Sequence, residues 1–117
     1  MERIDDLQCR GLRIIQDTDF YNFSLDPVLL VNLSTVKNNS IVVDLCSGSG
    51  IIPLLVAGKS NALKIYGIEI QCELASLAKR SVKLNSLEDR VEIINDDIKN
   101  YAKYLSRESV NVVYANP

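Results

Sequence analysis

The segment Ile41–Ile52 constrains the fold more than any other part of this 117-residue chain. An apolar run ends at Asp44, a loop of small residues follows, and a second apolar run begins at Ile51. This order predicts a buried strand, a tight loop and the start of a helix. Gly48 and Gly50 carry no side chains, so a ligand can approach the loop backbone and the free N–H groups of the next helical turn. A tight turn that binds nothing shows the same pattern, so the rest of the chain has to decide between the two.

Strands and helices are expected to alternate along most of the chain. Apolar runs predict core strands over 41–43, 64–68, 91–95 and 110–115. Helical patterns are expected over 26–36, 51–57, 71–85 and 98–105. This alternation implies right-handed crossovers and an α/β fold, in which an open, mainly parallel sheet is flanked by helices. At this length we expect one domain spanning 1–117.

The N-terminal segment is expected to form a short β-hairpin followed by a helix. Residues 12–16 predict a strand, and 20–23 predict a returning strand after a turn. Residues 28–36 are apolar on most sides, which predicts a buried helix. Further along, Gly58 is expected to end the helix that follows the glycine loop.

Composition narrows the function classes. The net charge is −2, which does not indicate a nucleic-acid binder, and the absence of histidine excludes His-based catalysis and His-ligated metals. Cys9, Cys46 and Cys72 are too widely spaced for a metal site or a disulfide framework, so we expect no metal and a reducing, cytoplasmic location. The acidic N-terminus does not resemble a signal peptide, and no apolar run is long enough to span a membrane.

Polar residues follow each predicted core strand, at the sheet edge where open parallel sheets bind ligands. Glu69 lies between two isoleucines and 19 residues after Gly50, a spacing expected of an acid that accepts both hydroxyls of a ribose. The alternative is a carboxylate that caps the following helix. Asp97, after Asp96, is expected to accept from an adenine amino group, to cap the third helix, or to do both. Asp44 is expected to brace the loop or to reach the cationic end of a ligand.

Two nucleotide cofactors fit these acids: a nicotinamide dinucleotide and S-adenosylmethionine. The loop lacks the third glycine of the dinucleotide pattern, and acids at every strand end suit a ligand with a sulfonium cation and no phosphate. Asn116-Pro117 favours methylation of an amine, because the Asn carbonyl and a backbone carbonyl can each accept an N–H from a planar amino group. Proline biases Asn116 toward an extended backbone. Catalysis would then consist mostly of alignment.

These motifs resemble the N-terminal part of the class I S-adenosylmethionine-dependent methyltransferases with an N-P-P-Y type motif. Within them, the chain is most similar to the bacterial tRNA(Val) adenine-N6 methyltransferases. The similar segments are 12–16, 23–30, 43–53, 67–71 and 95–98. The resemblance implies a Rossmann-like fold, S-adenosylmethionine as cofactor, tRNA as substrate, and Asn116 and Pro117 as catalytic residues. It implies cofactor binding by Asp44, Cys46, Ser47, Gly48, Gly50, Glu69, Ile70, Asp96, Asp97, Ile98 and Asn116.

The chain also departs from this family. Cys46 and Asp96 stand where the family often has glycine, and the motif's second proline and aromatic residue do not follow Pro117. That aromatic would stack on an extruded base. We therefore expect a domain cut short after its fourth core strand, whose free edge invites self-association. Two alternatives stay open: glutamine methylation of the release-factor type, and a non-catalytic binding or assembly module.

Overall fold

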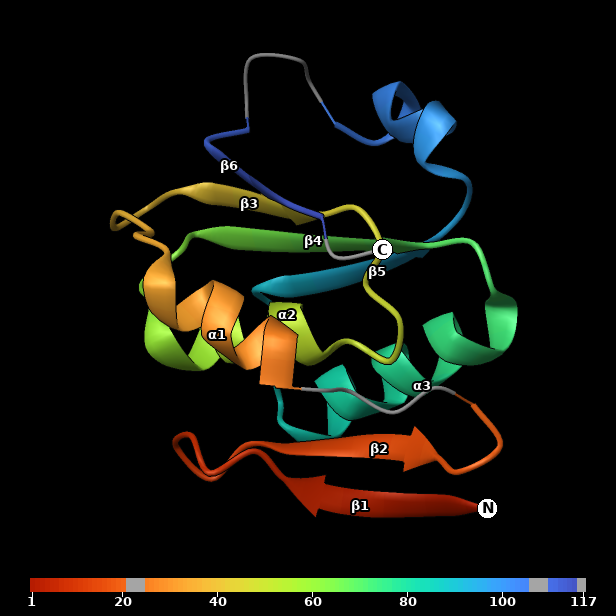
Figure 1. The fold of residues 1–117 in the computed structure, drawn as a ribbon. Helices are drawn as coiled ribbons and strands as arrows, with labels where there is room; N and C mark the ends of the chain where they lie inside the picture. Colours follow the sequence, from red (N-terminus) through yellow and green to blue (C-terminus); the bar gives the residue numbers. More distant parts are fainter. Residues whose placement is uncertain (21–24, 106–109, 116–117) are drawn as a thin grey trace.

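The core of the protein is a four-stranded parallel sheet. The computed structural model describes residues 1–20, 25–105 and 110–115. The sheet contains β3 (Ile41–Asp44), β4 (Lys64–Glu69), β5 (Val91–Asn95) and β6 (Val112–Tyr114) in the order β5-β4-β3-β6 (Figure 1). All three strand pairings are parallel, with Asp44 opposite Gly67 on one side and Tyr114 on the other. The predicted α/β fold with an open parallel sheet is therefore confirmed, and the carboxyl ends of its strands share one edge.

Three α-helices cover one face of the sheet, and a shorter helix lies on the other face. The α-helices are α1 (Leu25–Leu33), α2 (Ile51–Lys59) and α3 (Cys72–Leu84) (Figure 1). The helix expected over 98–105 is instead a 3₁₀-helix, η1 (Ile98–Lys103), and it has no buried residue. Its weak apolar pattern explains this difference, because an α-helix in a globular protein is stabilised mainly by an apolar face that it buries.

The main apolar core lies between the sheet and α2 and α3. Nearly all of α2 is buried, and so is one face of α3, formed by Leu74, Leu77, Ala78, Ser81 and Val82. A smaller cluster of Val43, Ile68, Ile94 and Leu105 occupies the opposite face of the sheet. This double-sided burial accounts for the continuous apolar runs that predicted the core strands.

The N-terminal hairpin is present, but its strands differ from the prediction. It pairs β1 (Glu2–Asp6) with β2 (Arg13–Asp17). The partner of β2 therefore precedes it in the chain, whereas the prediction placed the partner after it. Phe20 forms a bend, and the remainder of the strand expected over 20–23 lies outside the described residues. The polar pattern of β1 explains why it was missed: most of its side chains are exposed.

Contacts with α3 hold the hairpin in place. The Ile15 N–H donates to the Ser81 hydroxyl over 2.8 Å, inside the structure. At the surface, the Arg80 guanidinium donates to both carboxylate oxygens of Glu2. Arg80, although its side chain is half exposed, therefore takes part in an ion pair that links α3 to the hairpin.

Helix α1 is not the buried helix that its composition predicted. Val31 is buried against the core, but the side chains of Leu29, Leu30 and Leu33 are exposed. Among the described residues, α1 packs mainly on α2. One-sided packing cannot bury a helix that is apolar all round, which is why the prediction was wrong.

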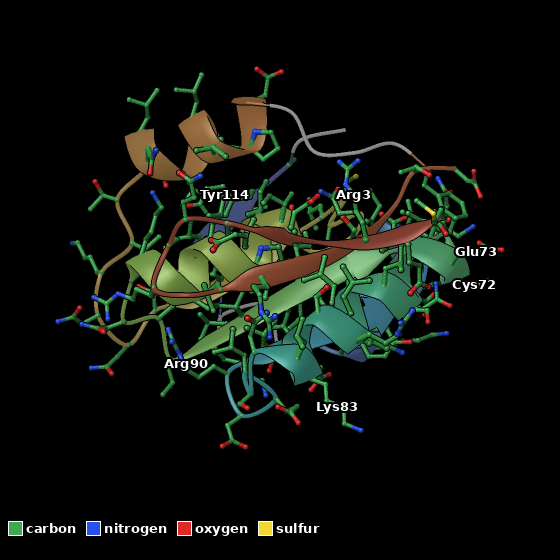
Figure 2. All side chains as sticks on the ribbon, turned by 90° about the horizontal axis from the view of Figure 1, so that it is seen from below. Arg3, Cys72, Glu73, Lys83, Arg90 and Tyr114 are labelled. Atoms are coloured by element: carbon green, nitrogen blue, oxygen red, sulfur yellow. The ribbon has the colours of Figure 1, made fainter. Side chains whose placement is uncertain are left out.

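The prediction that Gly58 ends α2 was wrong: this glycine lets the helix pack closely against the residues before β2. It lies inside the helix, and a Cβ there would approach Leu12 Cδ1 to 2.7 Å and Cys9 Sγ to 2.8 Å. Arg90 instead binds the end of this helix, because its guanidinium donates to the carbonyls of Ala57, Ser60 and Ala62. Figure 2 shows Arg90 at the opposite end of the molecule from Cys72, where α3 begins.

Strand β6 lies at one edge of the sheet, with β3 as its neighbour. Self-association through this edge stays a prediction. No helix in the described part of the chain is long and apolar enough to cross a membrane.

Candidate functional site

The glycine loop joins β3 to α2 and is held by both neighbouring strands. The Leu45 N–H donates to the Tyr114 carbonyl of β6, and the Ser47 N–H donates to the Ile68 carbonyl of β4. The Gly50 N–H closes the turn onto the Ser47 carbonyl over 2.8 Å. These bonds fix the loop at the carboxyl edge of the sheet, where ligands bind in open α/β sheets.

The two loop glycines meet different demands. Both have left-handed backbones, with φ of 54° at Gly48 and 98° at Gly50, which strongly favour glycine. A Cβ at Gly50 would lie 3.2 Å from the Ala78 Cβ, whereas a Cβ at Gly48 would meet open space. Gly50 therefore lets α3 pack against the start of α2, and the bare backbone of Gly48 faces a cavity.

Glu69 joins the glycine loop to the start of α3. Its Oε1 accepts from the Gly48 N–H over 2.8 Å, and its Oε2 accepts from the Gln71 N–H over 2.9 Å. The carboxylate is 8% exposed, and these two bonds offset the cost of burying it. Each oxygen accepts one hydrogen bond here, while a carboxylate offers about four acceptor positions, so two positions remain for donors from a ligand.

Asp44 ends the neighbouring strand, β3, and differs from Glu69 in its hydrogen bonding. It is fully buried, and neither of its carboxylate oxygens accepts a hydrogen bond from any described residue. Burial raises the pKa of the Asp44 carboxyl to about 7. The Cys46 N–H, which lies close without the geometry of a hydrogen bond, works against this rise, and the Glu69 charge adds to it. Within the described chain, the one other buried side-chain polar atom without a partner is the Ser47 hydroxyl.

A cavity of about 490 Å³ opens at this edge of the sheet. It contains eight of the residues predicted to bind the cofactor: Asp44, Cys46, Ser47, Gly48, Glu69, Ile70, Asp97 and Ile98. Gly50 and Asp96 do not line it, and Asn116 and Pro117 lie outside the described residues. The volume falls in the range of about 300–1,000 Å³ that is usual for small-molecule sites.

Other lining residues were not predicted from the sequence, among them Asp26, Pro27, Ser49, Gln71 and Leu74. Asp26 and Pro27 had been interpreted only as the start of a helix. No local signal marks them, because they reach the cavity through the packing of α1 on α2, which is a long-range contact. Gly67 does not line the cavity but leaves room for the loop that does, since a Cβ at Gly67 would lie 3.0 Å from the Ser47 Cβ.

The turn after β5 brings Asp97 to the cavity and points Asp96 toward η1. The Asp97 side chain accepts from the Lys99 N–H over 3.0 Å and caps η1, as one interpretation predicted. Asp96 accepts from the Tyr104 hydroxyl, the Asn100 side chain and the Asp97 N–H. The Tyr104 bond contributes most to holding the pKa of Asp96 at about 2. In this structure the Asp96 carboxylate thus organises the 3₁₀-helix.

The cavity carries a strongly negative lining. Four acids line it, namely Asp26, Asp44, Glu69 and Asp97, and no lysine or arginine does so within the described residues. Partial burial, together with Asp44 and Glu69, raises the pKa of the Cys46 thiol, which keeps this exposed thiol protonated and poorly nucleophilic. No group of three or more possible metal-ligating side chains was found in the described chain. Such a site favours a cationic ligand over one that carries phosphates.

The fold and the acid-lined cavity at its strand ends define a Rossmann-like methyltransferase domain. Residues 30–116 match the family model of the TRM5/TYW2 methyltransferase domain, and the chain belongs to this family.

The relatives include tRNA methyltransferases that act on guanine and on adenine. The chain is 39% identical over 67 residues to the tRNA (guanine(37)-N(1))-methyltransferase Trm5b of Methanocaldococcus jannaschii, covering 57% of this chain and 19% of the relative. It is 29% identical over 93 residues to the tRNA1(Val) (adenine(37)-N6)-methyltransferase of Bacteroides thetaiotaomicron, covering 79% and 38%. The chain therefore spans well under half the length of these relatives.

A solved structure agrees with this assignment. Trm5 of Methanocaldococcus jannaschii, crystallised in complex with adenosine, superposes with a TM-score of 0.67 and 31% identity, covering 85% of this chain and 30% of that one. The similarity to the tRNA1(Val) enzymes that the sequence motifs indicated is confirmed by the Bacteroides thetaiotaomicron relative, and the chain is similar to a guanine-N1 enzyme as well.

Proposed function

We propose that this chain binds S-adenosylmethionine and forms the cofactor-binding part of a methyltransferase that acts on a purine of tRNA. The observation that supports this most is the concentration of unsatisfied polar atoms in one cavity. Asp44 and Ser47 leave three buried oxygen atoms without partners among the described residues, and both residues line the cavity beside Glu69. Buried polar groups without partners are rare in native proteins, and a bound ligand is one way to satisfy them.

The lining fits each part of this cofactor. The two remaining acceptor positions of Glu69 suit the vicinal hydroxyls of the ribose. Ile70 and Ile98 both line the cavity and are exposed, so they offer apolar surfaces for an adenine ring. Asp97, which also lines the cavity, is assigned to accept from the adenine amino group. Asp44, the residue that directly precedes the glycine loop in the chain and lines the cavity, is assigned to the cationic methionine end.

The acids of the cavity argue against a dinucleotide. A pyrophosphate would need donors or cations, and it would meet the carboxylates of Asp26, Glu69 and Asp97 in this cavity, with no lysine or arginine from the described chain to offset them. The adenosine complex of the related Trm5 supports a nucleoside ligand. When bound, S-adenosylmethionine supplies a methyl group activated by its sulfonium.

For the substrate, we propose the exocyclic amine of an adenine, with Asn116 orienting the amino group and Pro117 restricting the backbone before it. The relative from Bacteroides thetaiotaomicron supports adenine, whereas Trm5b supports a ring nitrogen of guanine. Asn116 would accept the N–H of the amino group and direct the nitrogen lone pair at the methyl carbon. The amine proton leaves after transfer, so the chain needs no dedicated base at this position.

Isothermal calorimetry of the 117-residue chain tests cofactor binding. S-adenosylmethionine is expected to bind at one saturable site, and a nicotinamide dinucleotide is expected to give no saturable heat. Glu88→Ala, which changes an exposed acid in the loop before β5, should bind as the wild type does. Absence of saturation by S-adenosylmethionine, or tight binding of the dinucleotide, would overturn the proposal.

A second experiment tests the substrate. The chain is incubated with S-adenosylmethionine and unmodified tRNA, and the digested nucleosides are analysed by mass spectrometry. N6-methyladenosine is the expected product. N1-methylguanosine would replace the adenine proposal with a guanine one, and methylation of a release factor instead of tRNA would support the glutamine alternative. Cofactor binding without any product would leave a binding module.

A further inference from the structure

Asp44 stands apart from every other acid in the described structure. It has no exposed surface, both of its oxygens lack hydrogen-bond partners there, and it lines the cavity. By contrast, Glu69 next to it receives two backbone N–H bonds. An ionised carboxylate without such partners is costly to bury, so Asp44 needs either a cation or a proton.

No neighbouring element among the residues that the structure describes supplies that cation. From β4, Glu69 faces Asp44 with a negative charge, and from the loop Cys46 presents a neutral thiol. On the β6 side, the Tyr114 hydroxyl is hydrogen-bonded to the hydroxyl of Ser34, the residue that follows α1. Asp26 at the start of α1 and Asp97 before η1 add two more acids to the same cavity. Every charged group that the described residues place around this carboxylate therefore opposes its ionisation, which agrees with a pKa raised by burial to about 7.

We propose that Asp44 carries a proton in the free protein and releases it to solvent when the cationic methionine end of the cofactor enters the cavity. This inference rests on the proposed function. Cofactor binding then becomes an exchange at one carboxylate, in which the O–H bond of the neutral acid breaks and the ligand cation takes the place of the proton. Because the group must lose a proton before it can face a cation, the affinity falls as the pH falls.

Proton release is measured directly by calorimetry of wild-type protein at fixed pH, in buffers that differ in ionisation enthalpy. With a carboxyl pKa of about 7, about 0.9 proton should be released per cofactor bound at pH 6 and about 0.5 at pH 7. The dissociation constant is expected to be about fivefold higher at pH 6 than at pH 7. At pH 6 the ammonium group of the ligand stays protonated, so that group contributes little to the measured release.

Two comparisons assign the proton to Asp44. Asp44→Asn, which keeps the shape and removes the ionisation, should release none, whereas Asp89→Asn, in the exposed loop before β5, should behave as the wild type does. Adenosine, which lacks the methionine end, is expected to bind without releasing a proton. If Asp44→Asn does not fold, the wild-type buffer series and the adenosine titration decide the matter alone.

The two proposals can fail separately. If S-adenosylmethionine does not bind at any pH, the proposed function fails. If it binds with no buffer-dependent heat at pH 6, or if Asp44→Asn still releases about one proton, the proton-exchange inference fails while cofactor binding stands.

Discussion

Two neighbouring strands end in acids that the fold treats in opposite ways. At the end of β4, Glu69 is tied by two backbone N–H groups to the glycine loop and to the start of α3. At the end of β3, Asp44 is more deeply buried and receives no such bond from the described chain. The first acid contributes to the stability of the loop, whereas the second lowers stability and leaves a site that a ligand can satisfy. The difference in hydrogen bonding thus gives Glu69 a structural role and leaves Asp44 available to bind a ligand.

The largest expected effect is on the stability of Asp44→Asn. The carboxyl pKa is about 7 in the folded protein and near 3.8 in the unfolded chain, so the folded state holds more protons between these values. Stability of the wild type therefore falls as the pH rises through this window. The neutral amide avoids this loss, and the variant should be more stable than the wild type by about 4 kcal/mol at pH 8.

Urea unfolding at pH 8 and pH 4 measures this difference. At pH 4 the difference should shrink to about 0.6 kcal/mol, because Asp44 is then neutral in the folded state and only about 60% ionised in the unfolded chain. Asp89→Asn, an exposed change of the same chemistry, serves as the control. An Asp44→Asn variant that is less stable at pH 8 would show that the carboxylate has a partner in the folded protein, and the contrast with Glu69 would disappear.

Glu69→Ala is expected to have the next largest effect. It leaves the Gly48 and Gln71 N–H groups without their acceptor, which should cost about 2 kcal/mol of stability. Loss of two charged hydrogen bonds to the ribose should weaken S-adenosylmethionine binding about 100-fold. Thermal unfolding and calorimetry measure the two effects, with Glu88→Ala as the matched control.

Glu69→Gln separates charge from shape in the same test. One end of the amide is an NH₂ group, which would face a backbone N–H, so this variant should also lose stability. Full stability and affinity in the Gln variant would mean that a single oxygen of Glu69 suffices, against the two-sided role that the structure shows.

The two loop glycines give the smallest expected effects and sharpen the distinction between structure and binding. Gly50→Ala combines a left-handed backbone with crowding by Ala78 and should cost about 2 kcal/mol, while Gly48→Ala meets only the backbone cost of about 1 kcal/mol. For cofactor affinity the order should reverse, since Gly48 lines the cavity and Gly50 does not. Urea unfolding and calorimetry on both variants check this, and the same order in both measurements would contradict it.

Much of the site was predictable because parallel strands place their carboxyl ends at one edge. The positions of Asp44, Glu69 and Asp97 after apolar runs predicted that they would share a site, and the cavity contains all three. The part played by Asp26 was not predictable, since it depends on α1 packing against α2. The hairpin partner of β2 was missed for a related reason: β1 is polar, and it pairs as a strand that is mostly exposed.

The boundaries of the helices were also only partly predictable from local sequence patterns. The periodicity of α3 and its buried face followed from the sequence, because one side of the helix is polar and the other apolar. Helix α2 is apolar all round, so its pattern could not show that Gly58 lies inside the helix against Leu12 and Cys9. Apolar runs without a polar face contain no information about where the neighbouring elements lie.

The sequence by itself determined the alternation of strands and helices, the glycine turn, and the set of acids at one edge of the sheet. These follow from local periodicity and from the fixed direction of parallel crossovers. Only the tertiary structure decided which acid is satisfied and which is left with a proton or a ligand cation to bind. Hydrogen-bond partners and burial depend on residues that lie far apart along the chain, and no local pattern encodes them.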